Sequence, residues 1–195
     1  MNDREQLKAI RQYIKSVFKN DVSGHDFYHM SRVAKNAVQI AAYEDADLFI
    51  TEAAAWLHDV GDHKLFENPS KDIEKMNEFL RTLDISEEQI SVINTIINEI
   101  SFSKGKVPQS LEGKIVQDAD RLDAIGAIGI ARTFAYGGFH GQLIHHDELK
   151  NTSVQHFYDK LLTLKDTMNT NKARAIAEDR HGFMETFLNQ LDKEW

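Results

Sequence analysis

Three short segments of this sequence carry residue types that bind divalent metal ions. His58 and Asp59 are adjacent at the end of an apolar, alanine-rich stretch. Burying an imidazole and a carboxylate is unfavourable unless both have partners, and a divalent cation is a partner for both. An upstream segment supplies His29, and the segment 115–124 supplies aspartates inside an apolar run. Two imidazoles and two carboxylates would suit one divalent ion, namely Mn, Ni, Fe, Co, Zn or Mg.

The first half of the chain has the periodicity of helices. Apolar residues recur every three or four positions after Asn2, which predicts a helix with one buried face. Asn2-Asp3 can cap this first helix, because Asn and Asp side chains accept hydrogen bonds from the first amides of a helix. Gly24 breaks the chain, so we expect a second helix to begin near His25 or Asp26, and a third is expected to run from Asp47 to Val60. These two helices would carry the candidate ligands of this half.

The second half of the chain also has the sequence features of helices. Ser70 is predicted to cap a helix, and further helices are expected to start at Ser110, at Ser153 and at about Thr170. The segment 86–89 has the sequence of a capping box ahead of an isoleucine-rich helix. With only two prolines in the chain, the pattern predicts an all-α protein.

One segment of the second half is expected to be irregular. Tyr136 opens a glycine-containing stretch that runs to Ser153. Glycine allows the backbone to approach a phosphate closely, so this stretch is interpreted as a lid or binding loop, with a plain linker as the alternative.

Composition limits the class of protein. The 195 residues suit one domain spanning 1–195, and no internal repeat or linker suggests a second. The absence of cysteine favours a reducing, cytoplasmic setting. A net charge of −8 argues against a nucleic-acid partner, and no apolar run is long enough to span a membrane. The oligomeric state is left open by the sequence.

The order of the candidate ligands resembles a known family. His29, then His58–Asp59, then Asp120 match the H…HD…D signature of the HD superfamily of metal-dependent phosphohydrolases. A His-Asp dipeptide alone carries little information, but the ordered set with its flanking residues is specific. The resemblance implies a single-domain helical HD bundle in which these four residues hold one divalent ion.

The flanking residues resemble one branch of that family more particularly. The segments 26–33, 118–127 and 156–162 are similar to the small bacterial YedJ/YpgQ-type branch. The likeness extends from about Asp21 to about Leu188.

The resemblance also implies roles for residues near the ligands. An acid at the offset of Asp62 orients or deprotonates the attacking water in related families, although Asp62 can also be read as a turn residue. Lys64 is a catalytic candidate that would meet a phosphate oxygen, or a solvated surface lysine. His25, Arg121 and Lys160 are candidates for binding the substrate phosphates. The alternatives are a solvent-exposed histidine at the start of the helix for His25, an ion pair with a neighbouring aspartate for Arg121, and a surface lysine for Lys160.

The expected substrate is a small phosphorylated molecule. The resemblance favours a nucleoside triphosphate cleaved to a monophosphate and pyrophosphate by a water that the metal activates. A nucleoside monophosphate phosphatase would use the same ligands with a different pocket. A module that binds metal or nucleotide without catalysis is the alternative from another class.

Overall fold

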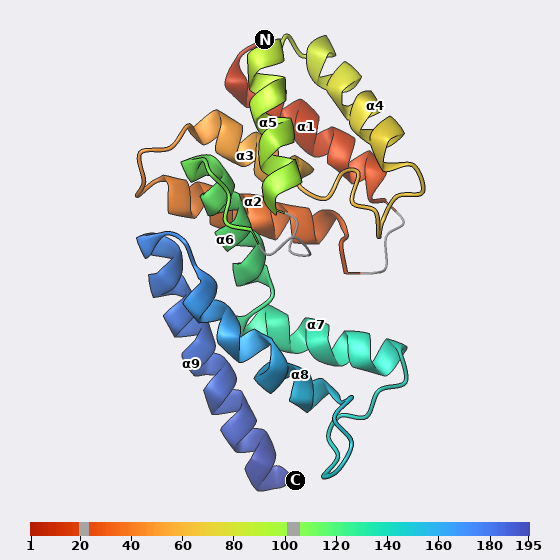
Figure 1. Ribbon diagram of the computed structural model, residues 1–195, viewed down its shortest axis with the longest axis vertical. Coiled ribbons are helices and arrows are strands. Elements are labelled where there is room, and N and C mark those ends of the chain that lie inside the picture. Colours follow the sequence, from red (N-terminus) through yellow and green to blue (C-terminus); the bar gives the residue numbers. More distant parts are fainter. Residues whose placement is uncertain (20–23, 101–105) are drawn as a thin grey trace. The chain divides into compact units, whose positions relative to one another are not determined.

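The computed structural model describes residues 1–19, 24–100 and 106–195, and these form two compact units, Met1–Ala119 and Asp120–Trp195 (Figure 1). The helices that begin in the first unit are α1 (Asp3–Val17), α2 (Phe27–Ala41), α3 (Leu48–Leu57), α4 (Pro69–Thr82), α5 (Glu87–Ile100) and α6 (Leu111–Asp123). The second unit continues with α7 (Gly126–Phe139), α8 (Ser153–Asp159), the 3-10 helix η2 (Leu161–Thr167) and α9 (Asn171–Glu194). Within the described ranges, β-structure is limited to an isolated bridge between Leu143 and Thr152. The predicted all-α class is confirmed.

The helices begin where short polar side chains satisfy their first amides. Asn2 forms a complete capping box at the start of α1. Asp26, Asp47 and Thr170 cap α2, α3 and α9, each accepting from the third amide of its helix. At α5 the Ser86 hydroxyl accepts from the Gln89 amide, and the Gln89 side chain accepts from the Ser86 amide. The predicted starts of these helices are confirmed, and so are the capping predicted at Asn2 and the capping box predicted at 86–89.

Two boundaries in the first unit differ from prediction. The third helix was expected to reach Val60, but α3 ends at Leu57 and the chain continues as turns. The fourth helix begins at Pro69 after Asn68, not at a Ser70 cap. Proline is favoured at the first helical position because its fixed φ suits the helix and that position needs no amide hydrogen.

One boundary in the second unit also differs from prediction. The segment expected to open into a loop at Tyr136 stays helical, because α7 continues to Phe139. The glycine at 137 fits there because a Cβ would lie 2.2 Å from the Ser153 hydroxyl oxygen. Helix α8 begins at Ser153, as predicted, and the Thr152 side chain caps it by accepting from the Gln155 amide. The irregular stretch therefore begins after α7.

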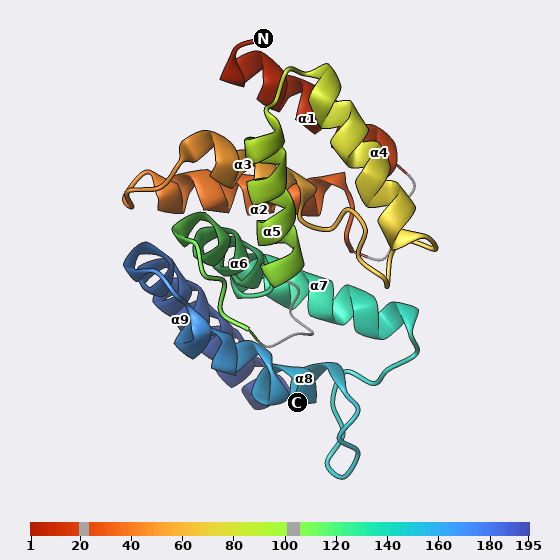
Figure 2. The same ribbon diagram turned by 45° about the horizontal axis from the view of Figure 1, so that its top comes forward.

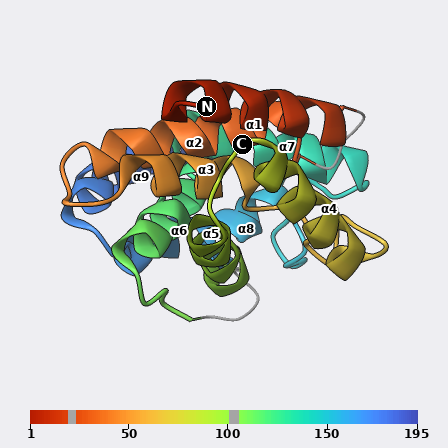
Figure 3. The same cartoon turned by 90° about the horizontal axis from the view of Figure 1, so that it is seen from above.

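The core of the first unit is built around α3. This helix is apolar on all sides, and such a helix is stable only when it is covered. It packs against α1, α2 and α5, and α1 lies alongside α2 and α3 in Figure 3. Helix α4 belongs to the same unit (Figure 2). The rings of Tyr13 on α1 and Phe79 on α4 are stacked, with their centroids 4.4 Å apart.

The second unit has an aromatic core of its own. Phe134 on α7, Phe157 on α8 and Phe187 on α9 contact one another, with ring centroids between 5.8 and 6.2 Å apart. Phe157 is fully buried. Among the helices of the described residues, none combines the length and apolar character that a membrane span needs.

Candidate metal centre

Three predicted ligands come from the facing ends of α2 and α3. His29 lies in the first turn of α2, and its backbone amide donates to the Asp26 carboxylate at 2.8 Å. His58 is the residue at which α3 ends, and Asp59 follows it. All three predicted ligands are buried. Because α2 and α3 pack on each other, the start of one helix and the end of the other present their polar groups to the same interior space.

An aromatic pair holds these two helix ends together. Phe27 lies two residues before His29, Trp56 lies two residues before His58, and their rings stack at 5.7 Å. The Arg11 guanidinium of α1 lies 5.8 Å from the Phe27 ring and 5.9 Å from the Trp56 ring. Stacking and cation–π contacts of this kind stabilise by about 1 kcal/mol each. They fix the register that brings His29 opposite His58.

The tautomer of His58 is set by the backbone. Its Nδ1 lies 2.9 Å from the carbonyl oxygen of Ala55. A carbonyl only accepts hydrogen bonds, so Nδ1 carries the hydrogen and Nε2 carries the lone pair. Metal-binding histidines in proteins are commonly oriented by this arrangement. His58 is therefore prepared to donate its Nε2 lone pair to a cation.

Both imidazoles lie close to the Asp59 carboxylate, each near a different oxygen. His29 Nε2 lies 3.6 Å from Asp59 Oδ2, and His58 Nε2 lies 3.5 Å from Asp59 Oδ1. The two imidazole rings are 5.2 Å apart. With bonds of about 2.0–2.2 Å, two ligands of one ion lie about 3 Å apart at a right angle and at most about 4.4 Å apart when opposite. The residues present fit a metal ion.

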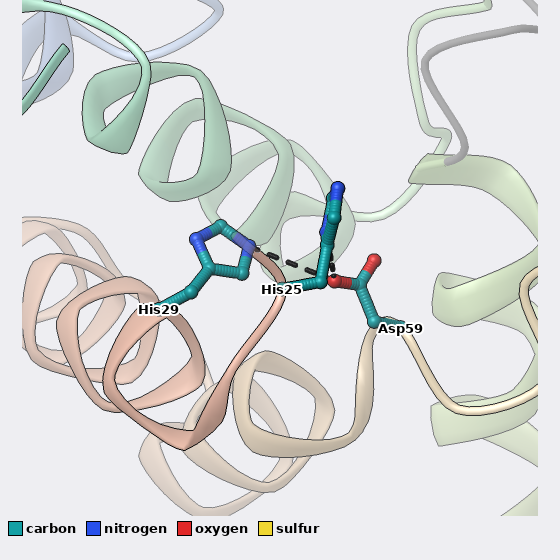
Figure 4. A group of neighbouring side chains, drawn as sticks. All are labelled: His25, His29 and Asp59. Atoms are coloured by element: carbon teal, nitrogen blue, oxygen red, sulfur yellow. Dashed lines mark hydrogen bonds and ion pairs between the residues drawn. The ribbon is translucent and has the colours of Figure 1, made fainter. Parts of the chain in front are cut away.

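His25 also reaches this cluster, although it lies before the helix. It precedes the cap residue Asp26, and its Nδ1 lies 2.7 Å from Asp59 Oδ2. Figure 4 shows His25 and His29 both directed at the Asp59 carboxylate. The ligand atoms of these three residues all lie within 4.8 Å of one another. The structure thus brings His25 into the cluster beside three of the predicted ligands.

The histidines control the charge of Asp59. Burial is the largest single influence and would raise the pKa of its carboxyl group. Electrostatic interaction with His58, the hydrogen bond with His25, and electrostatic interactions with His25 and His29 together outweigh burial and hold the pKa of Asp59 well below its usual range. Asp59 is therefore an anion at neutral pH, the form in which a carboxylate binds a metal.

The turn after Asp59 carries the two predicted catalytic residues. Gly61 has φ of +81°, and a Cβ there would lie 2.5 Å from Ile73, so this sharp turn requires glycine. Asp62 Oδ1 accepts a hydrogen bond from the backbone amide of Lys64 at 2.8 Å. This hydrogen bond is typical of a turn residue, which is the alternative interpretation of Asp62. Lys64 is exposed. The catalytic roles of both residues stay predictions.

The remaining predicted residues belong to the second unit. Asp120 is its first residue and lies in the last turn of α6. The Arg121 guanidinium donates to the Thr167 carbonyl oxygen at 2.5 Å, which ties α6 to η2. Lys160 stands between α8 and η2. The assignment of Asp120 to the metal, and of Arg121 and Lys160 to the substrate, stays a prediction.

Sequence reasoning missed two contributors to this centre. The carbonyl of Ala55 orients His58, and the Asp26 carboxylate holds the amide of His29. Every residue has a backbone carbonyl, so the sequence does not indicate which carbonyl orients a histidine. The sequence did contain a signal for Asp26. An aspartate three residues before a histidine at a helix start can cap the helix by accepting from the amide of that histidine.

The fold and the donor set define the class of protein. Residues 26–125 match the HD domain family. The chain belongs to this family, and the predicted all-α HD fold is confirmed. The match covers α2 to α6 and ends just before α7, so the extension of one HD-type domain over 1–195 stays a prediction.

Close relatives cover the whole chain. It is 44% identical to the uncharacterized protein YpgQ of Bacillus subtilis over 198 aligned residues, which cover 100% of this chain and 96% of YpgQ. The crystal structure of B. subtilis YpgQ in complex with ADP has a TM-score of 0.87 at 42% identity, covering 100% of this chain and 97% of that one. An HD-superfamily hydrolase from Bacillus thuringiensis has a TM-score of 0.85 at 44% identity, covering 100% and 98%. These relatives place the chain among HD-superfamily hydrolases.

Proposed function

We propose that this protein is a divalent-metal-dependent phosphohydrolase that cleaves nucleoside triphosphates, including deoxynucleotides, to monophosphate and pyrophosphate. The observation that carries the proposal is the convergence of His29 Nε2, His58 Nε2 and the Asp59 carboxylate at the packed ends of α2 and α3. The ADP bound by YpgQ supports a nucleotide as the substrate class. One divalent ion, Mn, Ni, Fe, Co, Zn or Mg, suits two imidazoles with carboxylates.

The proposed ligands are His29, His58, Asp59 and Asp120. The first three are supported by the geometry within the first unit. For the fourth, support comes from the residue before it, because the carbonyl of Ala119 accepts a hydrogen bond from the buried Asn36 on α2 at 3.2 Å. A divalent ion held by this set supplies Lewis acidity toward a phosphoryl oxygen and lowers the pKa of a water molecule.

The side chains around the ligands are assigned the remaining steps. Asp62 orients the attacking water or takes its proton through Oδ2, since Oδ1 accepts from the Lys64 amide. Lys64 neutralises charge on a phosphate oxygen as the leaving group departs. Arg121 and Lys160 bind the substrate phosphates, and His25 stands beside Asp59, where a phosphate oxygen would approach.

The test is product identification with a nucleotide panel. Purified protein with Mn²⁺ is incubated with nucleoside tri-, di- and monophosphates, and the products are separated by anion exchange. We expect monophosphate and pyrophosphate from triphosphates, loss of turnover in Asp59→Ala and in Asp62→Ala, and wild-type turnover in Asp45→Ala, which alters an exposed aspartate of the same unit. Orthophosphate released from monophosphates would replace the proposed reaction with a nucleotidase.

A second measurement separates binding from catalysis. Metal that binds the folded state stabilises it, by about 2.7 kcal/mol at a concentration one hundred times the Kd. Mn²⁺ should therefore raise the midpoint of thermal unfolding of the wild type and of Asp62→Ala, but not of Asp59→Ala. A metal-induced shift without turnover of any nucleotide would point to a non-catalytic binding module.

A further inference from the structure

We propose that His25 is a further nitrogen ligand of the ion held by His29 and Asp59. This inference rests on the metal-dependent function proposed above, and it assigns His25 to the ion instead of to the substrate. The motif His–His-Asp–Asp does not contain this residue. The structure nevertheless brings one ligand atom each from His25, His29 and Asp59 within 4.8 Å of one another. Figure 4 shows the three side chains together.

The His25 and His58 rings lie at nearly the same distance from the His29 ring. The His25 and His29 rings are 5.3 Å apart, and the His29 and His58 rings are 5.2 Å apart. His29 is therefore flanked by two imidazoles at nearly equal distances. Asp59 also lies near both of these histidines, with Oδ2 2.7 Å from His25 Nδ1 and Oδ1 3.5 Å from His58 Nε2.

The oxygen atoms of Asp59 point to the same conclusion. Oδ2 lies 2.7 Å from His25 Nδ1 and 3.6 Å from His29 Nε2, while Oδ1 lies 3.5 Å from His58 Nε2. The position that an ion takes between Oδ2 and His29 is thus also bordered by His25 Nδ1. With bonds of about 2.0–2.2 Å, ligands of one ion lie about 3 Å apart at a right angle, so a small movement of the His25 ring suffices.

The hydrogen bond between His25 and Asp59 does not prevent coordination. A neutral imidazole carries its hydrogen on either nitrogen. With the hydrogen on Nδ1, His25 donates to Asp59, and with the hydrogen on Nε2, the Nδ1 lone pair faces the cluster. The His25 side chain is 40% exposed, whereas the side chain of His29 is 1% exposed. His25 therefore meets the ion from the solvent side, where water can assist the change of tautomer.

Metal titration combined with a count of coordinated nitrogens tests this assignment. His25→Gln and His25→Ala are compared with wild type and with His63→Gln, which alters a histidine that is 65% exposed and faces Asp62. The Kd for Mn²⁺ is measured by calorimetry, and bound imidazoles are counted by pulsed EPR on the Mn²⁺-loaded protein. Circular dichroism and the unfolding midpoint report whether each variant folds.

We expect three coordinated imidazoles in wild type and in His63→Gln, and two in both His25 variants. The Kd should rise about ten- to one-hundred-fold in the His25 variants, as for groups that directly support a metal site. A weaker Kd with three imidazoles still bound, or an unchanged Kd, would overturn the assignment while leaving the metal-dependent function intact. A wild-type protein that binds no divalent ion would overturn both.

Discussion

Replacing Asp26 should weaken metal binding through the backbone, although Asp26 is not proposed as a ligand. Its carboxylate accepts a hydrogen bond from the His29 amide at 2.8 Å at the start of α2. Replacing a capping Asp by Ala costs about 1 kcal/mol, with a range of about 0.5–2 kcal/mol. For a chain of this size, about 1 kcal/mol lowers the unfolding midpoint by about 2–4 °C.

The same free energy limits the effect on metal affinity. If only the closed first turn holds His29 in place, the apparent Kd rises as the population of that turn falls. A loss of about 1 kcal/mol corresponds to about a fivefold change in that equilibrium, and the range of 0.5–2 kcal/mol corresponds to about two- to thirtyfold. We therefore expect the Kd of Asp26→Ala for Mn²⁺ to rise by up to about fivefold.

Asp47→Ala is the matched control. Asp47 caps α3 by accepting from the Ile50 amide at 2.9 Å, so its loss should lower stability by a similar amount. It stands at the opposite end of α3 from His58, about 16 Å away along the helix axis. Calorimetric titration should give a wild-type Kd for Asp47→Ala, and Asp26→Asn should restore binding.

The reasoning would be refuted if both Ala variants weakened binding equally. It would also be refuted if Asp26→Ala lost stability but kept the wild-type Kd.

Two further predictions concern the second unit. Gly129→Ala should lower the free energy of unfolding by about 1–3 kcal/mol, because the new Cβ would lie 2.2 Å from the Ala124 carbonyl oxygen. Gly138→Ala, with nothing within 4 Å of the new Cβ, should raise that free energy by up to about 1 kcal/mol in urea unfolding; the opposite order would refute the packing argument. Burial, then the charge of Lys160, lowers the pKa of His156 below its ordinary value of 6.5, so the unfolded chain binds the proton more readily and stability should fall as pH drops through about 6.5. His156→Gln should flatten this dependence in urea unfolding between about pH 7.5 and 5, and an unchanged slope would contradict it.

Helix starts were predictable from the sequence because their determinants are local. A capping side chain and the amide it accepts from are three residues apart, as at Asn2 and Asp47, so both groups are visible in one short window. The prediction that Ser70 caps the fourth helix was wrong because Pro69, one residue earlier, already fixes the backbone for a helix. Local competition between two valid signals decides such boundaries.

Features that depend on distant packing were not predictable. Glycines after Tyr136 suggested a loop, but the glycine at 137 lies against Ser153, sixteen positions later, and α7 continues through it. The types and order of the metal-binding residues were evident in the sequence. The contact of His25 with Asp59 was not, because it joins a residue outside any helix to one 34 positions away.

The carbonyl that orients His58 has a consequence for mutational robustness. It belongs to the main chain of Ala55, so exchanging the Ala55 side chain cannot remove the acceptor as long as the last turn of α3 forms. Position 55 can be varied for packing alone, within the limits of a fully buried site. The contact between His25 and Asp59 joins two side chains and can be deleted by one substitution. The orientation of His58 therefore depends on the backbone of α3, whereas the contact of His25 with Asp59 depends on two side chains.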